Sequence, residues 1–305
     1  MKYHRIVSEF LNTPWAIMPD KLASIANLLA DQSIGIKYDA EEIQNKIGAI
    51  DRIAPESKQG AIAVIPVRGT IVQRANMFDE VSGVVSADRI AASVMEAVND
   101  NEVSDIILDM STPGGSVYGI AEAAEVIYKA REHKRVIAVA NSLAASAGYW
   151  LGAAASELVV TPGGEVGSIG VITAHADYSK FIEAENMPMQ ALPKITFITS
   201  SEYKSEGNAY EPLSDEAKAS IQARVNEYDE MFVDAIARYR NTTAAAVKSG
   251  FGKGRVVGAQ EAVNLGMADR IATLSEVLGD LRSAGRTSNT RHRASVSKRK
   301  LLAQI

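Results

Sequence analysis

Two observations predict an α/β fold with a mostly parallel sheet for this chain of 305 residues. Segments of helical periodicity alternate with short apolar, β-branched segments from residue 87 to residue 160, and this order builds strand–helix–strand units. The composition, 47% hydrophobic and 23% charged, is that of a globular protein long enough to bury a sizeable core.

The chain is expected to begin with a small helical module. Apolar residues recur at helical spacing in DKLASIANLLADQ and AEEIQNKIGAI, which predicts helix over residues 2–48. The polar stretch DRIAPESKQG follows, and domain boundaries often have this composition. We therefore assign residues 1–58 to the helical module, 59–284 to the main domain, and 285–305 to a basic tail that we expect to be disordered.

The main domain is expected to open with strands in AIAVIPVRGTIV, broken by a turn at Arg68 and Gly69. Its alternating part is predicted to contain, in order, helix 87–100, strand 103–110, helix 117–131, strand 135–140, a helix from about 146, and strand 157–161. A second group is predicted to consist of strand 168–174, helix 178–185, strand 195–199 and a long amphipathic helix from Ser214 to Arg240. GRVVGAQEAVNLGMADRIATLSEVL then indicates a helix closed by Gly266, a short strand and a last helix.

The composition excludes several kinds of chemistry. The chain has no cysteine, so it can form neither a disulfide nor a thiolate nucleophile, and its four histidines show no metal-ligand spacing. We therefore expect no metal site and no cofactor. Residues 281–305 hold seven Lys or Arg and no acid, which leaves residues 1–280 with 25 basic and 37 acidic residues, a net charge of −12. An acidic body of this kind is a poor partner for nucleic acid.

Neither a secretion signal nor a membrane span is expected. The first segment, MKYHRIVSEFLNTPWAIM, carries Glu9 and other polar residues where a signal peptide needs an uninterrupted apolar core. The uncharged run from Val136 to Ser156 is rich in alanine, serine and glycine, so it is too weakly apolar to span a bilayer. We interpret this run as a buried strand plus a tightly packed helix, and we expect a cytoplasmic protein.

Two motifs are candidates for chemistry. STPGGS, residues 111–116, follows a predicted strand and precedes a helix, which is where open α/β sheets place ligands, although its glycines would also serve a plain turn. Ser146 lies among Ala145, Ala147 and Gly148 near a predicted helix start, and such small neighbours would let a carbonyl group approach its hydroxyl. The alternative role for Ser146 is that of a helix cap.

A serine hydroxyl needs a base to become a nucleophile, and two residues downstream are candidates. His175 lies 29 residues after Ser146, and Lys204 lies 58 residues after it. A lysine has an ordinary pKa of about 10.4, so Lys204 would serve as a base only if an apolar environment lowered its pKa to about 7–8. From these residues alone, both candidates stay open.

Five segments together resemble the signal peptide peptidase A family, which includes the head maturation proteases of lambda-type phages. The segments occur in the family's order and approximate spacing over roughly residues 60–275, and they are STPGGS, NSLAASAGYW, GEVGSIGVI, SSEYKSEGN and GRVVGAQEAVNLGMAD. The resemblance implies a serine endopeptidase with a Ser/Lys dyad. It also implies the spiral fold of ββα units that the Clp protease subunit and the crotonases share.

Matched segment by segment, the resemblance implies roles for individual residues. Ser146 would be the nucleophile and Lys204 the general base, and Ser168 in GSIG would orient the lysine. The N–H groups of the oxyanion hole would come from Gly115 and Ala147, and the substrate would contact Gly114 and Gly115.

The resemblance also bears on His175, the other candidate base. The segment around His175, GSIGVITAHADYS, resembles the Ser/Lys family, and no Clp-like histidine motif surrounds it. A structural role is therefore implied for His175, and Lys204 is favoured as the base.

The resemblance also implies partners and a setting. Family members assemble into rings or domes that enclose their active sites or complete them between subunits, so we expect a homo-oligomer. The apolar faces of residues 2–48 and of the helix from Ser214 are candidate interfaces. The segment LNTPWAIMPDKLASI resembles phage and prophage members, which implies action within an assembling procapsid on scaffold, portal or the chain itself. The spanning segment of the membrane-bound members is not seen in this sequence, which puts the clearance of signal peptides in doubt.

Three alternatives stay open. One is a cytoplasmic peptidase that degrades peptides. Another is a crotonase-like acyl-CoA enzyme, which would normally need active-site carboxylates, and no carboxylate pair accompanies STPGGS or NSLAASAGYW. The third is a catalytically inactive assembly protein on a protease fold.

Overall fold

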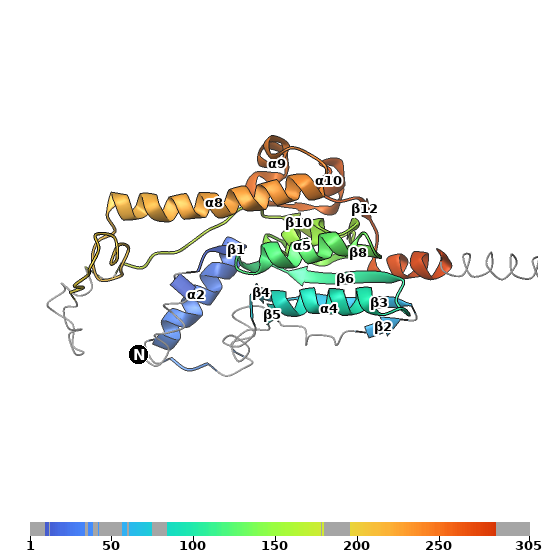
Figure 1. The fold of residues 1–305 in the computed structure, drawn as a ribbon, viewed down its shortest axis with the longest axis horizontal. Coiled ribbons are helices and arrows are strands. Elements are labelled where there is room, and N and C mark those ends of the chain that lie inside the picture. Colours follow the sequence, from blue (N-terminus) through green and yellow to red (C-terminus); the bar gives the residue numbers. More distant parts are fainter. Residues whose placement is uncertain are drawn as a thin grey trace, which may run out of the picture.

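A large sheet and a small sheet organise the chain, and helices pack on both faces of the large one (Figure 1). The structure is a computed structural model. It describes residues 10–11, 13–33, 36–38, 42, 57–59, 61–74, 84–177, 179 and 196–284.

The large sheet is mostly parallel. The strands along it are β11 (Val256–Gly258), β10 (Glu165–Gly167), β8 (Arg135–Ala145), β6 (Asp105–Thr112), β3 (Ile62–Arg68) and β2 (Ser57–Gln59), while β9 (Glu157–Val160) pairs with β8 and with β12 (Arg270–Ile271). Only the β2–β3 and β10–β11 pairs among these are antiparallel. The predicted α/β class with a mostly parallel sheet is therefore confirmed.

The small sheet begins where a central strand of the large sheet ends. Its strands are, in order, β1 (Trp15–Ile17), β7 (Gly114–Ser116), β4 (Thr70–Val72) and β5 (Val84–Ser86). Only Pro113 separates β7 from β6, and only Gly69 separates β4 from β3. Gly69 has a φ of 83°, which confirms the predicted turn and explains why a glycine stands there.

The helices follow the predicted order. They are α2 (Pro19–Ser33), α4 (Ala87–Asn99), α5 (Ile120–Ala130), α6 (Ala147–Ala153), α8 (Asp215–Tyr239), α9 (Ala244–Gly250) and α10 (Ala259–Asn264), with a 3-10 turn η1 (Gly252–Gly254) and a final helix over 274–284. The long predicted helix is α8. Its first turn is capped by Ser214, whose side chain accepts a hydrogen bond from the Ala217 N–H at 3.1 Å.

Two hydrophobic cores hold the main domain together. The larger core lies between the large sheet and helices α4, α5, α6 and α8, and it includes the fully buried Trp150, Tyr149 and Phe232. The smaller core lies on the opposite face of the sheet under the final helix, which contributes Val277 and Leu281. Strands buried on both faces explain the near-continuous apolar runs of β6 and β8.

Several sequence predictions differ from the structure. Residues 15–17 lie within the predicted helical region but form β1, because they pair with β7 instead of continuing α2. The strand predicted over 168–174 is wrong, since β10 ends at Gly167, where positive φ angles at Gly167 and Ser168 turn the chain. The strand predicted over 195–199 is wrong for residues 196–199, where Ile198 is 97% exposed and no strand lies alongside.

Other predictions fall partly or wholly outside the part of the chain that the structure describes. The basic tail 285–305 lies outside it, and so does the helix predicted over 178–185, except for Ser179. The domain boundary placed after residue 58 falls within β2. In the described ranges, no helix has both the length and the apolar composition to cross a bilayer.

Candidate active site

The glycines of the STPGGS motif are required by close packing at the join of the two sheets. A Cβ on Gly115 would lie 1.8 Å from the Ile71 carbonyl oxygen, so only glycine lets β7 lie against β4. Gly114 has a φ of 102°, and its N–H donates to Thr112 Oγ1 at 3.1 Å. Both edges of β7 are occupied, by β4 on one side and by β1 on the other.

Ser146 occupies a sharp turn between β8 and α6. Its φ of 53° and ψ of −117° are unusual for a residue other than glycine, and such backbone strain persists only where the surroundings enforce it. Its N–H donates to the Gly167 carbonyl at 2.7 Å, and its carbonyl accepts from the Trp150 N–H at 2.9 Å. Its side chain caps no N–H of the helix. The hydroxyl is buried and has no hydrogen-bond partner among the described residues, so a helix cap is not its role.

The small residues beside Ser146 are explained by the seating of α6 on β6. Every residue of α6 is buried. A Cβ on Gly148 would lie 2.3 Å from Thr112 Cγ2, and a Cβ on Gly152 would lie 3.0 Å from Met110 Sδ. The composition of NSLAASAGYW therefore has a packing cause.

Ser168 lies beside Ser146. Gly167 of β10 pairs with Ala145 of β8, and each of the two serines is the next residue after one member of this pair. Ser168 also has a positive φ, 52°, and its N–H donates to the Arg255 carbonyl at 2.8 Å. The structure thus brings together Ser146, Ser168 and the glycines of β7, and a Cβ on Gly114 would lie 2.9 Å from Ser146 Cβ.

Lys204 is not part of this group within the single chain. It lies in a turn before α8, its side chain is exposed, and its N–H donates to the Ser201 carbonyl at 3.2 Å. The first turns of α8 extend beyond the body of the protein (Figure 1). Exposed apolar side chains lie nearby in the sequence: Phe197 is 44%, Ile198 97% and Tyr203 59% exposed.

His175 also makes no contact with Ser146 that would support a role as base. Its Nε2 atom is buried and has no hydrogen-bond partner within the described ranges. Neither candidate base is therefore joined to Ser146 in one copy of the chain.

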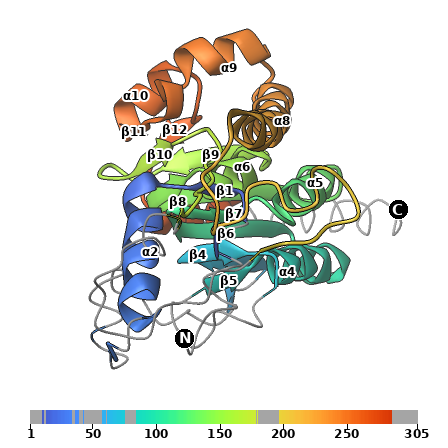
Figure 2. The same ribbon diagram turned by 90° about the vertical axis from the view of Figure 1, so that its left-hand side faces the viewer.

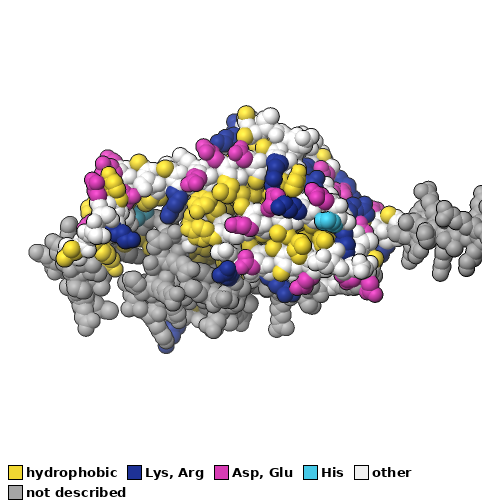
Figure 3. Space-filling view, in the orientation of Figure 1, with side chains coloured by type: hydrophobic (Ala, Val, Ile, Leu, Met, Phe, Trp, Pro, Cys, Tyr) yellow, Lys and Arg dark blue, Asp and Glu magenta, His cyan; other side chains and the backbone are white. Residues whose placement is uncertain are grey.

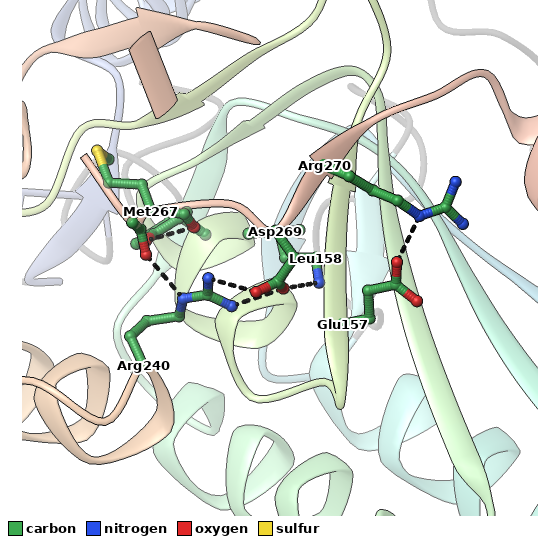
Figure 4. A network of polar contacts seen from close by, with 8 residues as sticks. Glu157, Leu158, Arg240, Met267, Asp269 and Arg270 are labelled. Carbon is green, nitrogen blue, oxygen red and sulfur yellow. Dashed lines mark hydrogen bonds and ion pairs between the residues drawn. The ribbon is translucent and has the colours of Figure 1, made fainter. Parts of the chain in front are cut away.

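A polar network joins the C-terminal end of α8 to β9 and to the residue before β12 (Figure 4). Arg240 donates to both carboxylate oxygens of Asp269, at 2.8 and 2.9 Å, and Asp269 also accepts from the Leu158 N–H at 2.7 Å. Burial alone would raise the pKa of Asp269, but the hydrogen bonds from Arg240 and Leu158 hold it below its ordinary value.

Tyr149, inside α6, donates to the Met267 carbonyl at 3.0 Å, and burial raises the pKa of its hydroxyl. These contacts position the helix that carries Ser146. No motif or spacing in the sequence indicates this network.

The arrangement of a buried hydroxyl beside backbone N–H groups suits acyl transfer. In the described part of the chain, no three His, Cys, Asp or Glu side chains converge to hold a metal ion. The strand β1, which pairs with β7 beside Ser146, was not predicted as a neighbour of the candidate site. The prolines on either side of its apolar triplet, Pro14 and Pro19, were the available signal that the chain there is extended.

Comparison with known proteins places the chain among peptidases. Residues 128–286 match the model of peptidase family S49. The capsid assembly protease C of Escherichia phage lambda is 34% identical over 73% of this chain and 49% of its own length. The head-tail preconnector protein GP5 of Enterobacteria phage P21 is 33% identical over 73% of this chain and 43% of its own length. The chain therefore spans about half, or less, of these two relatives.

Two further comparisons are more distant. A putative signal peptide peptidase of Enterococcus faecium is 29% identical over 60% of this chain and 52% of its own length. A ClpP1 variant from Listeria monocytogenes covers 69% of this chain and 91% of its own, with 15% identity and a TM-score of 0.41. Because the family model matches more than half of the sequence, including Ser146, Ser168 and Lys204, the chain belongs to peptidase family S49.

Proposed function

We propose that this protein is a serine endopeptidase in which Ser146 is the nucleophile and Lys204 the general base. The observation that carries the proposal is the Ser146 hydroxyl, which is buried on a strained strand-to-helix turn, lies beside the β7 glycines and has no partner in the described structure. A strained turn of this kind holds a nucleophilic serine in other α/β enzymes.

The proposed reaction is acyl transfer. Ser146 Oγ attacks the carbonyl carbon of a peptide bond while Lys204 Nζ takes the hydroxyl proton. The N–H groups of Gly115 and Ala147 stabilise the oxyanion, each by about 2.7–4 kcal/mol in the transition state. The lysine returns the proton to the departing amine, and water hydrolyses the acyl-enzyme by the same route.

The proposed site is completed between two copies of the chain. Lys204 is exposed in the turn before α8, whose first turns extend beyond the body, and the exposed Ile198 and Tyr203 give this turn an apolar surface that another copy would cover. The residues on either side of Ser146, Ala145 and Ala147, are fully buried and uncharged. A lysine that reached Ser146 would be desolvated there, which favours the neutral amine that can accept a proton. Ser168 beside Ser146 would orient this amine.

A second apolar surface supports assembly into a homo-oligomer. Apolar side chains gather between α8 and α5 on the face shown in Figure 3. Met231 of α8 is 44% exposed, and Tyr118, just before α5, is 39% exposed. The names of the two phage relatives support a role in capsid assembly, so we propose that the substrates are scaffold, portal or other head proteins and that cleavage takes place within the assembling procapsid.

A mixing experiment tests the shared site. Ser146→Ala and Lys204→Ala proteins should each fail to cleave unfolded casein. An equal mixture should regain about a quarter of wild-type activity, because one interface in four pairs an intact serine with an intact lysine. His175→Ala serves as the matched control and should keep its activity. A mixture as inactive as its components would refute the shared site, loss of activity in His175→Ala would make histidine the base, and a wild type that cleaves nothing would contradict the peptidase proposal.

A further inference from the structure

The strand β1 lies in the position that an extended peptide substrate would take. It is antiparallel to β7 on one edge, and on its other edge Trp15 exchanges two backbone hydrogen bonds with Ile172, both at 2.8 Å. Figure 2 shows β1 and β7 side by side near the centre of the molecule. Both edges of this short strand are therefore paired, as they are for a peptide inserted between two strands.

The register places one carbonyl group of β1 at the proposed oxyanion hole. The Val117 N–H donates to the Pro14 carbonyl at 3.1 Å, and the Met18 N–H donates to the Pro113 carbonyl at 3.0 Å. Hydrogen-bonded pairs alternate along an antiparallel ladder. The pair midway between these two, Ala16 and Gly115, is therefore also a hydrogen-bonded pair, in which the Ala16 carbonyl faces the Gly115 N–H.

The same carbonyl group lies close to the candidate nucleophile. A Cβ on Gly114 would lie 2.2 Å from the Ala16 oxygen, 2.9 Å from Ser146 Cβ and 3.0 Å from Ile17 Cα. The Ala16 oxygen and Ser146 Cβ are thus at most 5.1 Å apart, the sum of the first two distances. Ala16 and Ser146 are both fully buried, so β1 contributes to closing the serine off from solvent.

The packing of β1 allows it to leave without loss of the main cores. Most of its apolar side chains belong to a separate small cluster with α2, made of Phe10, Trp15, Ile17, Leu22 and Leu29. Ile172 packs against this cluster, and Ala16 alone of the three strand residues enters the larger core.

We propose that β1 is an intramolecular occupant of the peptide-binding groove, with the Ala16–Ile17 peptide at the place of the scissile bond. An extended peptide substrate, with a small residue facing Ser146, binds only after β1 has left the groove. This inference rests on the proposed function, which makes the groove a substrate-binding site. Its test does not depend on catalysis.

A disulfide lock tests the proposal. Trp15 and Ser116 are opposite each other at a non-hydrogen-bonded position of the ladder, where Cα atoms are about 4.5 Å apart and a disulfide can form. The natural chain has no cysteine, so Trp15→Cys with Ser116→Cys gives a single possible disulfide. The probe is a fluorescent peptide of residues 13–19, TPWAIMP, added to this double variant in a Ser146→Ala background. The two single cysteine variants, treated with the same oxidant and reductant, are the matched controls.

The reduced protein should bind the peptide at least tenfold more tightly than the oxidised protein, because apparent affinity scales with the fraction of open grooves. The single variants should not respond to oxidation. Equal binding by both forms, or no binding by the reduced form, would overturn the proposal. With Ser146 restored, cleavage by the locked form would overturn the inference and leave the proposed function standing. Peptide binding that depends on oxidation, with no cleavage by any form, would support the inference and contradict the proposed function.

Discussion

Substitution of Gly148 by alanine tests the idea that α6 is seated on β6 without spare room. The added methyl group would lie 2.3 Å from Thr112 Cγ2, and both residues are in fully buried surroundings. Overpacking of this kind costs about 1–3 kcal/mol, and the better helix propensity of alanine returns up to about 1 kcal/mol. The expected net loss in the free energy of unfolding is about 1–2 kcal/mol, which lowers Tm by about 2–3 °C in a protein of this size.

The assay is urea unfolding followed by far-UV circular dichroism, with thermal melts as a second measure. Gly250→Ala is the matched control, because nothing lies within 4 Å of a Cβ there, so stability should stay constant or rise. A Thr112→Ser change removes the clashing methyl group and keeps the hydroxyl that accepts from the Gly114 N–H. In that background the Gly148→Ala change should cost nothing. Equal stability of the Gly148→Ala protein and the wild type, or the same loss with serine at position 112, would refute the packing argument.

Three further predictions concern the contacts around α6 and α8. Asp269 has a lowered pKa, so it stabilises the fold above about pH 4 and loses that contribution as pH falls further; the stability gap between wild type and Asp269→Asn in urea unfolding should shrink from pH 6 to pH 3, and a constant gap would contradict this. Ser214→Ala should cost about 0.5–2 kcal/mol through the lost α8 cap, and an unchanged urea midpoint would argue against the cap. Tyr149→Phe should cost about 1–3 kcal/mol because the buried Met267 carbonyl loses its donor; a smaller loss than that of a surface Tyr203→Phe control would count against this.

Most helices and strands of the main domain were predictable, because their caps, turn glycines and apolar patterns favour the same structure that the packing of the domain requires. The long helix α8 begins one residue after the expected Ser214, which acts as its cap, and the turn at Gly69 has the positive φ that its glycine suggested. The core strands β6 and β8 follow from apolar runs that only a buried parallel strand would carry.

The failures have two physical causes, which are pairing between segments far apart in sequence and backbone angles that the apolar pattern does not reveal. The strand β1 has three residues, and it pairs with β7, about a hundred residues later, so the neighbouring prolines could indicate an extended chain but not its partner strand. The β10 boundary depends on positive φ angles at Gly167 and Ser168, which the apolar pattern does not reveal.

Part of the candidate site was predictable, because residues that follow neighbouring strands lie together at one edge of the sheet. The structure brings Ser146, Ser168 and Gly114 together, because they follow neighbouring strands of the sheets. Lys204 lies exposed in the turn before α8 in its own chain, and its partnership with Ser146 stays a prediction. A sequence does not state which copy of the chain supplies a side chain.

The unusual backbone of Ser146 has a consequence for how this protein would respond to selection. A φ of 53° with a ψ of −117° costs a serine about 1–3 kcal/mol, and glycine at the same position would avoid most of that cost. A library screened for thermal stability alone would therefore enrich Ser146→Gly. With Ser146 as the proposed nucleophile, this more stable variant would have no hydroxyl for catalysis, so an effort to engineer a more stable form must screen for stability and activity together.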